Sequence, residues 1–156
     1  MPGKIDARLA ELGIALPEPA APAGAYVPYV VTGSLVFVAG QITLENGEIK
    51  YKGRLGESMS VDDGYAAARL CGLNLLAQVR GACAGDLDRV KRVVRLGGFV
   101  NSAADFTDQP KVINGASALM VEVFGDAGRH ARAAVGAPSL PLGVSVEVEG
   151  IFEIAE

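Results

Sequence analysis

The sequence contains no tryptophan, one histidine and two cysteines among its 156 residues. A zinc site of the usual kind is disfavoured, because His130, Cys71 and Cys83 supply too few well-spaced ligands. The two cysteines fall twelve positions apart on one predicted helix, about 18 Å along its axis, which is too far for a disulfide. They indicate buried thiols in a reducing compartment.

Several functional motifs and long apolar segments are also missing. The chain has no Gly-x-x-x-x-Gly-Lys, Gly-x-Gly-x-x-Gly or Gly-x-Ser-x-Gly motif, so phosphate-binding loops and serine hydrolase chemistry have no support. No apolar run approaches the roughly 18 residues of a membrane span, and residues 1–16 lack the apolar core of a secretory signal. We therefore predict a cytoplasmic protein without a membrane partner.

Composition favours one folded domain with an acidic surface. The chain is 50% hydrophobic and 21% charged, which is enough apolar side chain for a core, and its length fits one domain. The formal net charge is −4, and the isoelectric point is about 5.0. Nucleic-acid binding depends on clustered Lys and Arg, so we do not expect a nucleic-acid partner.

Hydrophobic periodicity and turn residues predict an α+β domain. We expect a short helix ending at Gly13 and a proline-rich connector over 16–24, so that residues 1–23 precede the main domain, 24–156. The main domain is predicted to hold a hairpin over 26–42, a turn at 46–47, helices over 60–83 and 108–125, and strands over 90–100, 130–135 and 144–154. Two helices would cover one face of a mixed sheet, and the bare second face suggests an oligomer.

The C-terminal third holds the residues with most chemical potential. Arg132 follows His130 on one predicted strand, and Glu147 comes fifteen residues after the arginine, with Glu149 on the same strand face. These charges could form an ordinary cross-strand ladder on a solvated surface. Alternatively, Arg132 could hold a carboxylate while Glu147 positions or activates water.

Two sequence motifs resemble the Rid family of reactive intermediate deaminases, also called YjgF or endoribonuclease L-PSP. The C-terminal motif comprises Ala131-Arg-Ala-Ala-Val135, then Leu140-Pro141, then Val146-Glu-Val-Glu-Gly-Ile151. The N-terminal motif is Val38-Ala-Gly-Gln-Ile42, with Tyr26 at the family's usual distance before it. The resemblance covers residues 24 to 155.

The resemblance implies a chorismate-mutase-like subunit in a homotrimer, with clefts between subunits. Deaminating members hydrolyse enamines and imines, such as 2-aminoacrylate, to 2-ketoacids and ammonia without a cofactor or a metal. By position, Arg132 would bind the substrate carboxylate and Glu147 would orient water. The predicted substrate-binding positions are Tyr26, Gly40, Asn114 and Ala134.

Departures from the family pattern leave other functions open. Ala134 stands where the family frequently has Cys or Ser, and Ala39 replaces a common Ser. A non-catalytic trimer that binds small carboxylates and acts in regulation is therefore the alternative to a deaminase. The endoribonuclease activity attributed to some relatives is the least supported, because the net charge is negative.

Overall fold

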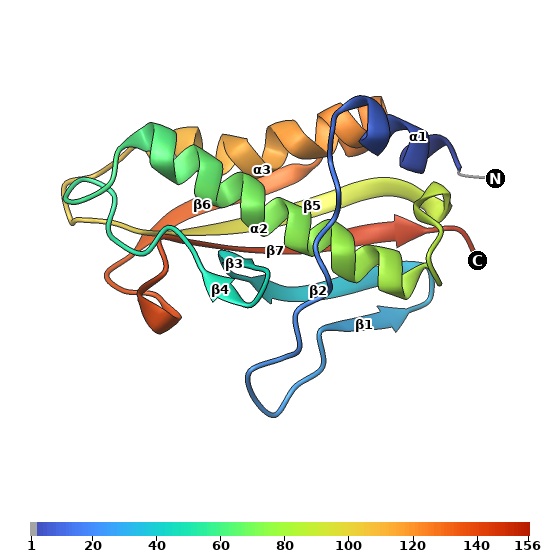
Figure 1. Ribbon diagram of the computed structural model, residues 1–156, viewed down its shortest axis with the longest axis horizontal. Helices are drawn as coiled ribbons and strands as arrows, with labels where there is room; N and C mark the ends of the chain where they lie inside the picture. The colour runs from blue at the N-terminus through green and yellow to red at the C-terminus, as the bar shows by residue number, and fades with distance from the viewer. Residues whose placement is uncertain (1–2) are drawn as a thin grey trace.

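A five-stranded sheet forms the base of the structure, and two long helices lie across one of its faces (Figure 1). The computed structural model describes residues 3–156, so the first two residues of the predicted segment 1–23 lie outside the described residues. The helices are α1 (Lys4–Glu11), α2 (Val61–Ala82) and α3 (Gln109–Phe124). The strands are β1 (Tyr29–Thr32), β2 (Leu35–Gln41), β3 (Leu44–Glu45), β4 (Glu48–Ile49), β5 (Val90–Asn101), β6 (Ala131–Ala137) and β7 (Val146–Ile154).

The sheet is mixed, as predicted. Its strand order is β1-β2-β7-β5-β6, and the last strand of the chain therefore lies in the centre. The β5–β6 pair is parallel, and the other neighbouring pairs are antiparallel. Strands β3 and β4 form a separate two-stranded hairpin around Asn46 and Gly47, both with positive φ, which confirms the predicted turn.

Helix α2 begins where the sequence predicts, because Ser60 and Asp63 form a reciprocal capping box at its N-terminus. The Ser60 hydroxyl accepts a hydrogen bond from the Asp63 N–H at 3.1 Å, and the Asp63 carboxylate accepts one from the Ser60 N–H at 3.2 Å. Leu75, Leu76 and Val79 are fully buried on the face of α2 turned toward the sheet. Among residues 3–156, no helix is both long enough and apolar enough to cross a membrane.

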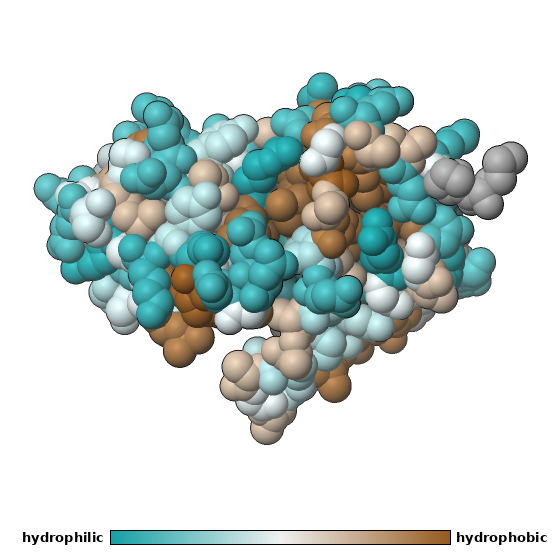
Figure 2. All heavy atoms as spheres, viewed as in Figure 1, coloured by the Kyte–Doolittle hydropathy of each residue, from teal (hydrophilic) through white to brown (hydrophobic). Residues whose placement is uncertain are grey.

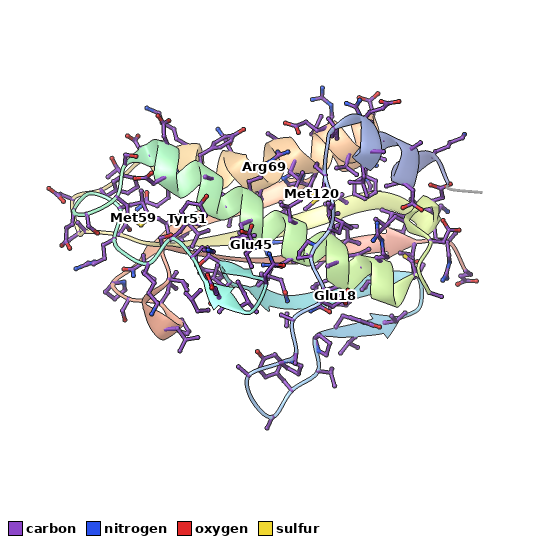
Figure 3. The ribbon with its side chains drawn as sticks, viewed as in Figure 1. Glu18, Glu45, Tyr51, Met59, Arg69 and Met120 are labelled. Atoms are coloured by element: carbon purple, nitrogen blue, oxygen red, sulfur yellow. The ribbon has the colours of Figure 1, made fainter. Side chains whose placement is uncertain are left out.

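The N-terminal segment is docked on the domain by contacts distant in sequence. Leu9 of α1 is 3% exposed and belongs to the same hydrophobic core as the rest of the chain. The Asp88 carboxylate accepts hydrogen bonds from the N–H groups of Ile5 and Lys4 at 2.9 and 3.0 Å, and these bonds lower the pKa of Asp88. The connector then crosses α2 beside Glu18 (Figure 3).

Within residues 3–156, no α-helix covers the face of the sheet turned away from α2 and α3, which we call the open face (Figure 1). Several of its side chains are apolar and exposed. Val30 of β1 pairs with Phe37 of β2, and these side chains are 51% and 40% exposed. Val135 of β6 is 47% exposed on the same face. Exposed apolar side chains of this size are candidates for a contact surface, and the expectation of a covering partner stays a prediction.

Helices α2 and α3 approach each other closely at Gly115, and this contact yields a stability prediction. A Cβ at Gly115 would collide with the Tyr65 carbonyl oxygen, which is backbone and cannot turn aside. We expect Gly115→Ala to lower the free energy of unfolding by about 1–3 kcal/mol, measured by urea denaturation.

Gly81→Ala is the matched control for this substitution. Gly81 is likewise a helical glycine, in α2, but its Cβ would be 3.6 Å from the nearest atom, the Tyr29 hydroxyl, so nothing has to move. Alanine also favours a helix over glycine. A loss of stability in Gly81→Ala as large as that in Gly115→Ala would contradict the proposed helix contact.

Candidate functional site

The charged residues of the predicted site lie on opposite faces of the sheet. Arg132 of β6 pairs with Leu96 of β5, which is fully buried beneath the helices, so the arginine lies on the helix side. Glu147 of β7 lies between Val146 and Val148, which are also fully buried, so the glutamate lies on the open side. Strand β5 separates β6 from β7 by about 10 Å in total. Arg132 and Glu147 of one chain therefore do not contact each other.

Arg132 is held in place by side chains of α3. Its Nη1 donates hydrogen bonds to Asn114 Oδ1 at 2.8 Å and to Ser117 Oγ at 3.2 Å. Its Nη2 donates to the Pro110 carbonyl at 3.4 Å. Ser117 in turn contacts His130 Nε2 at 2.9 Å. We call Arg132, Asn114, Ser117 and His130 the arginine group.

Within residues 3–156, no carboxylate neutralises the charge of Arg132. All of its hydrogen-bond acceptors are uncharged, and none of the ion pairs found within residues 3–156 includes it. The arginine group opens onto a shallow depression of about 570 Å³, which Arg129 and Tyr65 also line. A guanidinium with oriented but uncharged partners is suited to binding a carboxylate or another planar anion.

Glu147 lies in a second hollow, whose walls are mostly apolar. The cavity has a volume of about 500 Å³ and brings Glu147 together with Tyr26 and Gly40, which we call the glutamate group. The connector, at residues 20–23, and the loop before β7, at residues 141–142, form much of its wall. Figure 2 shows the surface hollowed between these two segments, at the lower edge of the view.

Burial in this cavity changes the acidity of Glu147. Desolvation raises the pKa of the Glu147 carboxyl above its ordinary value, and the negative charge of Glu149 raises it further. A carboxyl group with a raised pKa is better able to exchange protons near neutral pH than an exposed one. Glu147 is therefore the candidate proton-transfer group of the site.

A β-bulge in β2 brings the backbone close to Glu147. Val38 pairs with Gly150 and Gln41 pairs with Val148, so Ala39 and Gly40 together face one residue of β7. The bulge is braced by a 2.9 Å hydrogen bond from the Gln41 side chain to the Ala39 carbonyl. A Cβ at Gly40 would collide with the Glu147 carboxylate, so only glycine leaves room for that carboxylate.

The structure also places the remaining predicted residues. Ala134 is half-buried, packs against the hydrophobic core and lines neither cavity. The alternative of a charge ladder joining Arg132 to the glutamates is not observed, because the two lie on opposite faces. A cross-strand ion pair does exist between β5 and β7, where Glu149 Oε2 lies 3.7 Å from Arg95 Nη1.

Sequence reasoning missed three contributors to these sites. Ser117 belongs to no recognisable sequence motif, although it lies three residues after Asn114 and therefore on the same helix face. The proline-rich sequence predicts only a connector over residues 16–24, although residues 20–23 line the glutamate cavity. Asn74 donates hydrogen bonds to the carbonyls of Ile42 and Leu44 and so fixes the loop beside the cavity. The sequence signal that could have indicated this role is a polar residue on the apolar face of α2, since buried polar groups are hydrogen-bonded.

Comparisons with known proteins agree with this architecture. Residues 6–153 match the family model described as "YjgF/chorismate_mutase-like, putative endoribonuclease", and the chain belongs to this family. It is 50% identical over 153 residues to "Protein TCP17" of Trypanosoma cruzi, covering 97% of this chain and 95% of that protein. The match confirms the family resemblance seen in the two sequence motifs.

Solved structures of relatives share the fold. The crystal structure of Atu1372 from Agrobacterium tumefaciens, a protein of unknown function, has a TM-score of 0.90 and 48% identity, covering 97% of this chain and 92% of that one. A more distant structure, Escherichia coli TdcF with bound serine, has a TM-score of 0.63 and 25% identity, covering 91% and 97%. The α+β fold with a chorismate-mutase-like sheet is therefore shared across the family.

Proposed function

We propose that this protein is a cofactor-free hydrolytic deaminase of small enamine and imine acids such as 2-aminoacrylate. An enamine first becomes its imine by moving one proton from nitrogen to carbon. Water then adds to the polarised C=N carbon of the imine, and the C–N bond of the adduct breaks. The products are a 2-ketoacid and ammonia, so the reaction consumes one water and needs no oxidant or cofactor. The required groups are a cation for the carboxylate and a carboxylate that moves the proton.

Arg132 and Glu147 would fill these two roles. Arg132 binds the substrate carboxylate through its planar guanidinium, and Glu147 takes a proton from the attacking water and returns it to the leaving nitrogen. The observation that carries the proposal is the presence in one chain of two complementary groups: an arginine that forms no ion pair within residues 3–156, and a half-buried glutamate whose pKa is raised. Serine bound to TdcF, a small amino acid with a carboxylate, supports a ligand of this class.

Arg132 and Glu147 do not meet within one copy of the chain, so we include in the proposal a homotrimer with sites between subunits. The arginine group lies at the β6 edge on the helix side, and the glutamate group lies on the open side. The exposed apolar side chains of the open face, Val30, Phe37 and Val135, would be covered in such an assembly. Sedimentation at micromolar protein tests this: a 16.1 kDa species would remove the interfacial site.

The activity test supplies the unstable substrate in place. An amino-acid oxidase generates 2-iminobutyrate, and the rate of 2-ketobutyrate formation is compared with and without the protein. We expect a clear acceleration that Arg132→Ala abolishes; equal rates with and without protein would exclude the deaminase. The two buried free thiols fit a cytoplasmic location for such chemistry.

The alternative is a regulatory trimer that binds small carboxylates without turning them over. Ala134 favours it, because a thiol or hydroxyl frequent in the family is missing there. Calorimetry with 2-ketobutyrate separates the two functions, since binding without turnover would support the regulatory trimer. Ribonuclease activity that survives purification and disappears in Arg132→Ala would instead support the endoribonuclease.

The close approach of Gly40 to Glu147 gives a further prediction. In Gly40→Ala the new methyl group must displace the Glu147 carboxylate, and misplacing a reacting group by about 1 Å costs up to roughly 100-fold in rate. We therefore expect kcat to fall by about 10- to 100-fold in steady-state assays.

A double-mutant cycle distinguishes this collision from general damage to β2. The stability cost of Gly40→Ala should shrink when Glu147→Ala removes the obstructing carboxylate. An undiminished cost would show that the methyl group clashes elsewhere, and the proposed contact would then be rejected.

A further inference from the structure

A chain of hydrogen bonds runs from the backbone through His130 and Ser117 to Arg132. His130 Nδ1 lies 2.6 Å from the Gly128 carbonyl oxygen, and His130 Nε2 lies 2.9 Å from Ser117 Oγ. Ser117 Oγ then accepts a hydrogen bond from Arg132 Nη1 at 3.2 Å. Neither Ser117 nor His130 is placed in the catalytic roles proposed above.

For a neutral imidazole, the donors and acceptors of this chain match in one arrangement. A carbonyl oxygen only accepts, so the imidazole nitrogen facing Gly128 must carry the proton. Neutral His130 then has a lone pair on Nε2, which accepts the Ser117 hydroxyl proton. That leaves the Ser117 oxygen free to accept from Arg132, and each group in the chain is satisfied.

The hydrogen bonds of Arg132 leave one edge of its guanidinium for a ligand. Arginine carries five N–H donors, of which two are on Nη1 and two are on Nη2. Both Nη1 donors are used, one by Asn114 and one by Ser117, and one Nη2 donor is used by Pro110. The free donors are the Nε–H and the second Nη2–H, and Nε forms no hydrogen bond within residues 3–156. Nε and Nη2 form one edge of the planar guanidinium, and this edge is the one left for a carboxylate.

Local geometry explains why these four side chains meet. Asn114 and Ser117 are three residues apart on α3 and share its face, whereas His130 and Arg132 are two residues apart and share a face at the start of β6. Asn114 and Ser117 on α3 therefore face His130 and Arg132 of the strand segment, and the four side chains meet. The sequence pattern Asn-x-x-Ser with His-x-Arg encodes this contact.

We propose that Ser117 and His130 are positioning residues that lock Nη1 of Arg132 and direct its Nε/Nη2 edge at the ligand carboxylate. This inference rests on the proposed function for the identity of the ligand. Loss of one such hydrogen bond should weaken carboxylate binding by about threefold to tenfold. It should raise KM and the Kd for 2-ketobutyrate while leaving kcat within about twofold, because proton transfer by Glu147 is untouched.

The hydrogen-bond chain is tested first by nitrogen NMR, which needs no activity. His130 is the one histidine of the sequence, so protein labelled with ¹⁵N-histidine gives a single imidazole. At slightly alkaline pH we expect the neutral Nδ1–H tautomer and an Nε2 resonance that shifts downfield in Ser117→Ala, where its donor is lost. An Nε2–H tautomer, or no shift in the variant, would overturn the proposed chain.

A matched pair of His130 variants tests the effect on binding. His130→Gln places an amide oxygen near the Nε2 position and keeps an acceptor for Ser117, whereas His130→Asn reaches only the Nδ1 position. We expect raised KM and Kd in His130→Asn and in Ser117→Ala, with near-normal values in His130→Gln and in Ser117→Thr, which retains the hydroxyl. Equal values in all four variants would reject a positioning role.

The result also separates this inference from the proposed function. If the unaltered protein neither binds 2-ketobutyrate nor hydrolyses 2-iminobutyrate, the proposed function fails, although the NMR result still decides the hydrogen-bond chain. If the unaltered protein is active, Arg132→Ala is inactive and Ser117→Ala is normal in KM and Kd, the positioning role fails alone. A fall in kcat without a rise in KM would also contradict it.

Discussion

Arg132→Ala is expected to lower kcat/KM for a small imine acid by about 10²- to 10³-fold. The substitution removes a charge-assisted, bidentate contact with the substrate carboxylate, and loss of such a contact costs about 2–4 kcal/mol. The fold should persist, because Arg132 lies on the edge strand β6 and its partners on α3 are half-exposed or exposed. Steady-state kinetics with imine generated in place, together with a urea melt, measure both effects.

Arg132→Lys is the informative companion to this variant. Lysine keeps the positive charge but presents a single ammonium group, which does not reproduce the paired donors of guanidinium. It would also lose the simultaneous contacts with Asn114, Ser117 and Pro110. We expect most of the activity to be lost, and an unchanged kcat/KM in Arg132→Ala would eliminate the proposed site.

Glu147→Gln is expected to reduce kcat by about 10²- to 10³-fold while changing 2-ketoacid binding much less. Glutamine keeps the shape of the side chain and can still contact water, but its amide does not accept the proton of the attacking water. Comparing kcat with the Kd for 2-ketobutyrate separates the two effects. A parallel loss of both would indicate that Glu147 binds substrate rather than transferring a proton.

The raised pKa of Glu147 gives this residue a recognisable pH dependence. If its carboxylate is the base, activity should fall on acidification through a pKa above the ordinary glutamate value, and Glu147→Gln should lack this limb. Stability should change in the opposite direction. The folded chain binds the proton more tightly than the unfolded chain, so the contribution to stability is full at acidic pH and is lost as pH rises through the folded-state pKa.

Thermal melts of the two proteins across a pH series check this sign. Relative to the unaltered protein, the Tm of Glu147→Gln should rise as pH increases from about 4 to 8, since glutamine does not ionise. A Tm difference that is independent of pH would show that burial of the Glu147 carboxylate carries no electrostatic cost.

Local sequence signals were enough to predict most elements of the fold. Ser60 and Asp63 form their capping box whatever the rest of the chain does, and Asn46-Gly47 favours a tight hairpin on its own. Alternation along β6 and β7 correctly indicated which residues share a face within each strand. The family resemblance then supplied the roles of residues that lie far apart in the sequence.

Relations between elements could not be predicted in this way. Face sharing within a strand does not tell which face of the sheet Arg132 and Glu147 occupy, because that depends on the register in which β6 and β7 pair with β5. The docking of α1 depends on Asp88, which is 84 residues from Lys4, and no local pattern reports such a contact. Ser117 was missed for the same reason, since its importance comes from a strand that follows much later.

The placement of Arg132 and Glu147 on opposite faces has a consequence for mixtures of defective chains. If the proposed homotrimer is a closed ring, each site would take its arginine from one chain and its glutamate from the next. Arg132→Ala and Glu147→Gln chains would each be nearly inactive alone, but a ring containing both would join an intact arginine to an intact glutamate. Random mixing at equal amounts would make about a quarter of the sites complete. Two inactive preparations, unfolded and refolded together, would thus restore activity to each other.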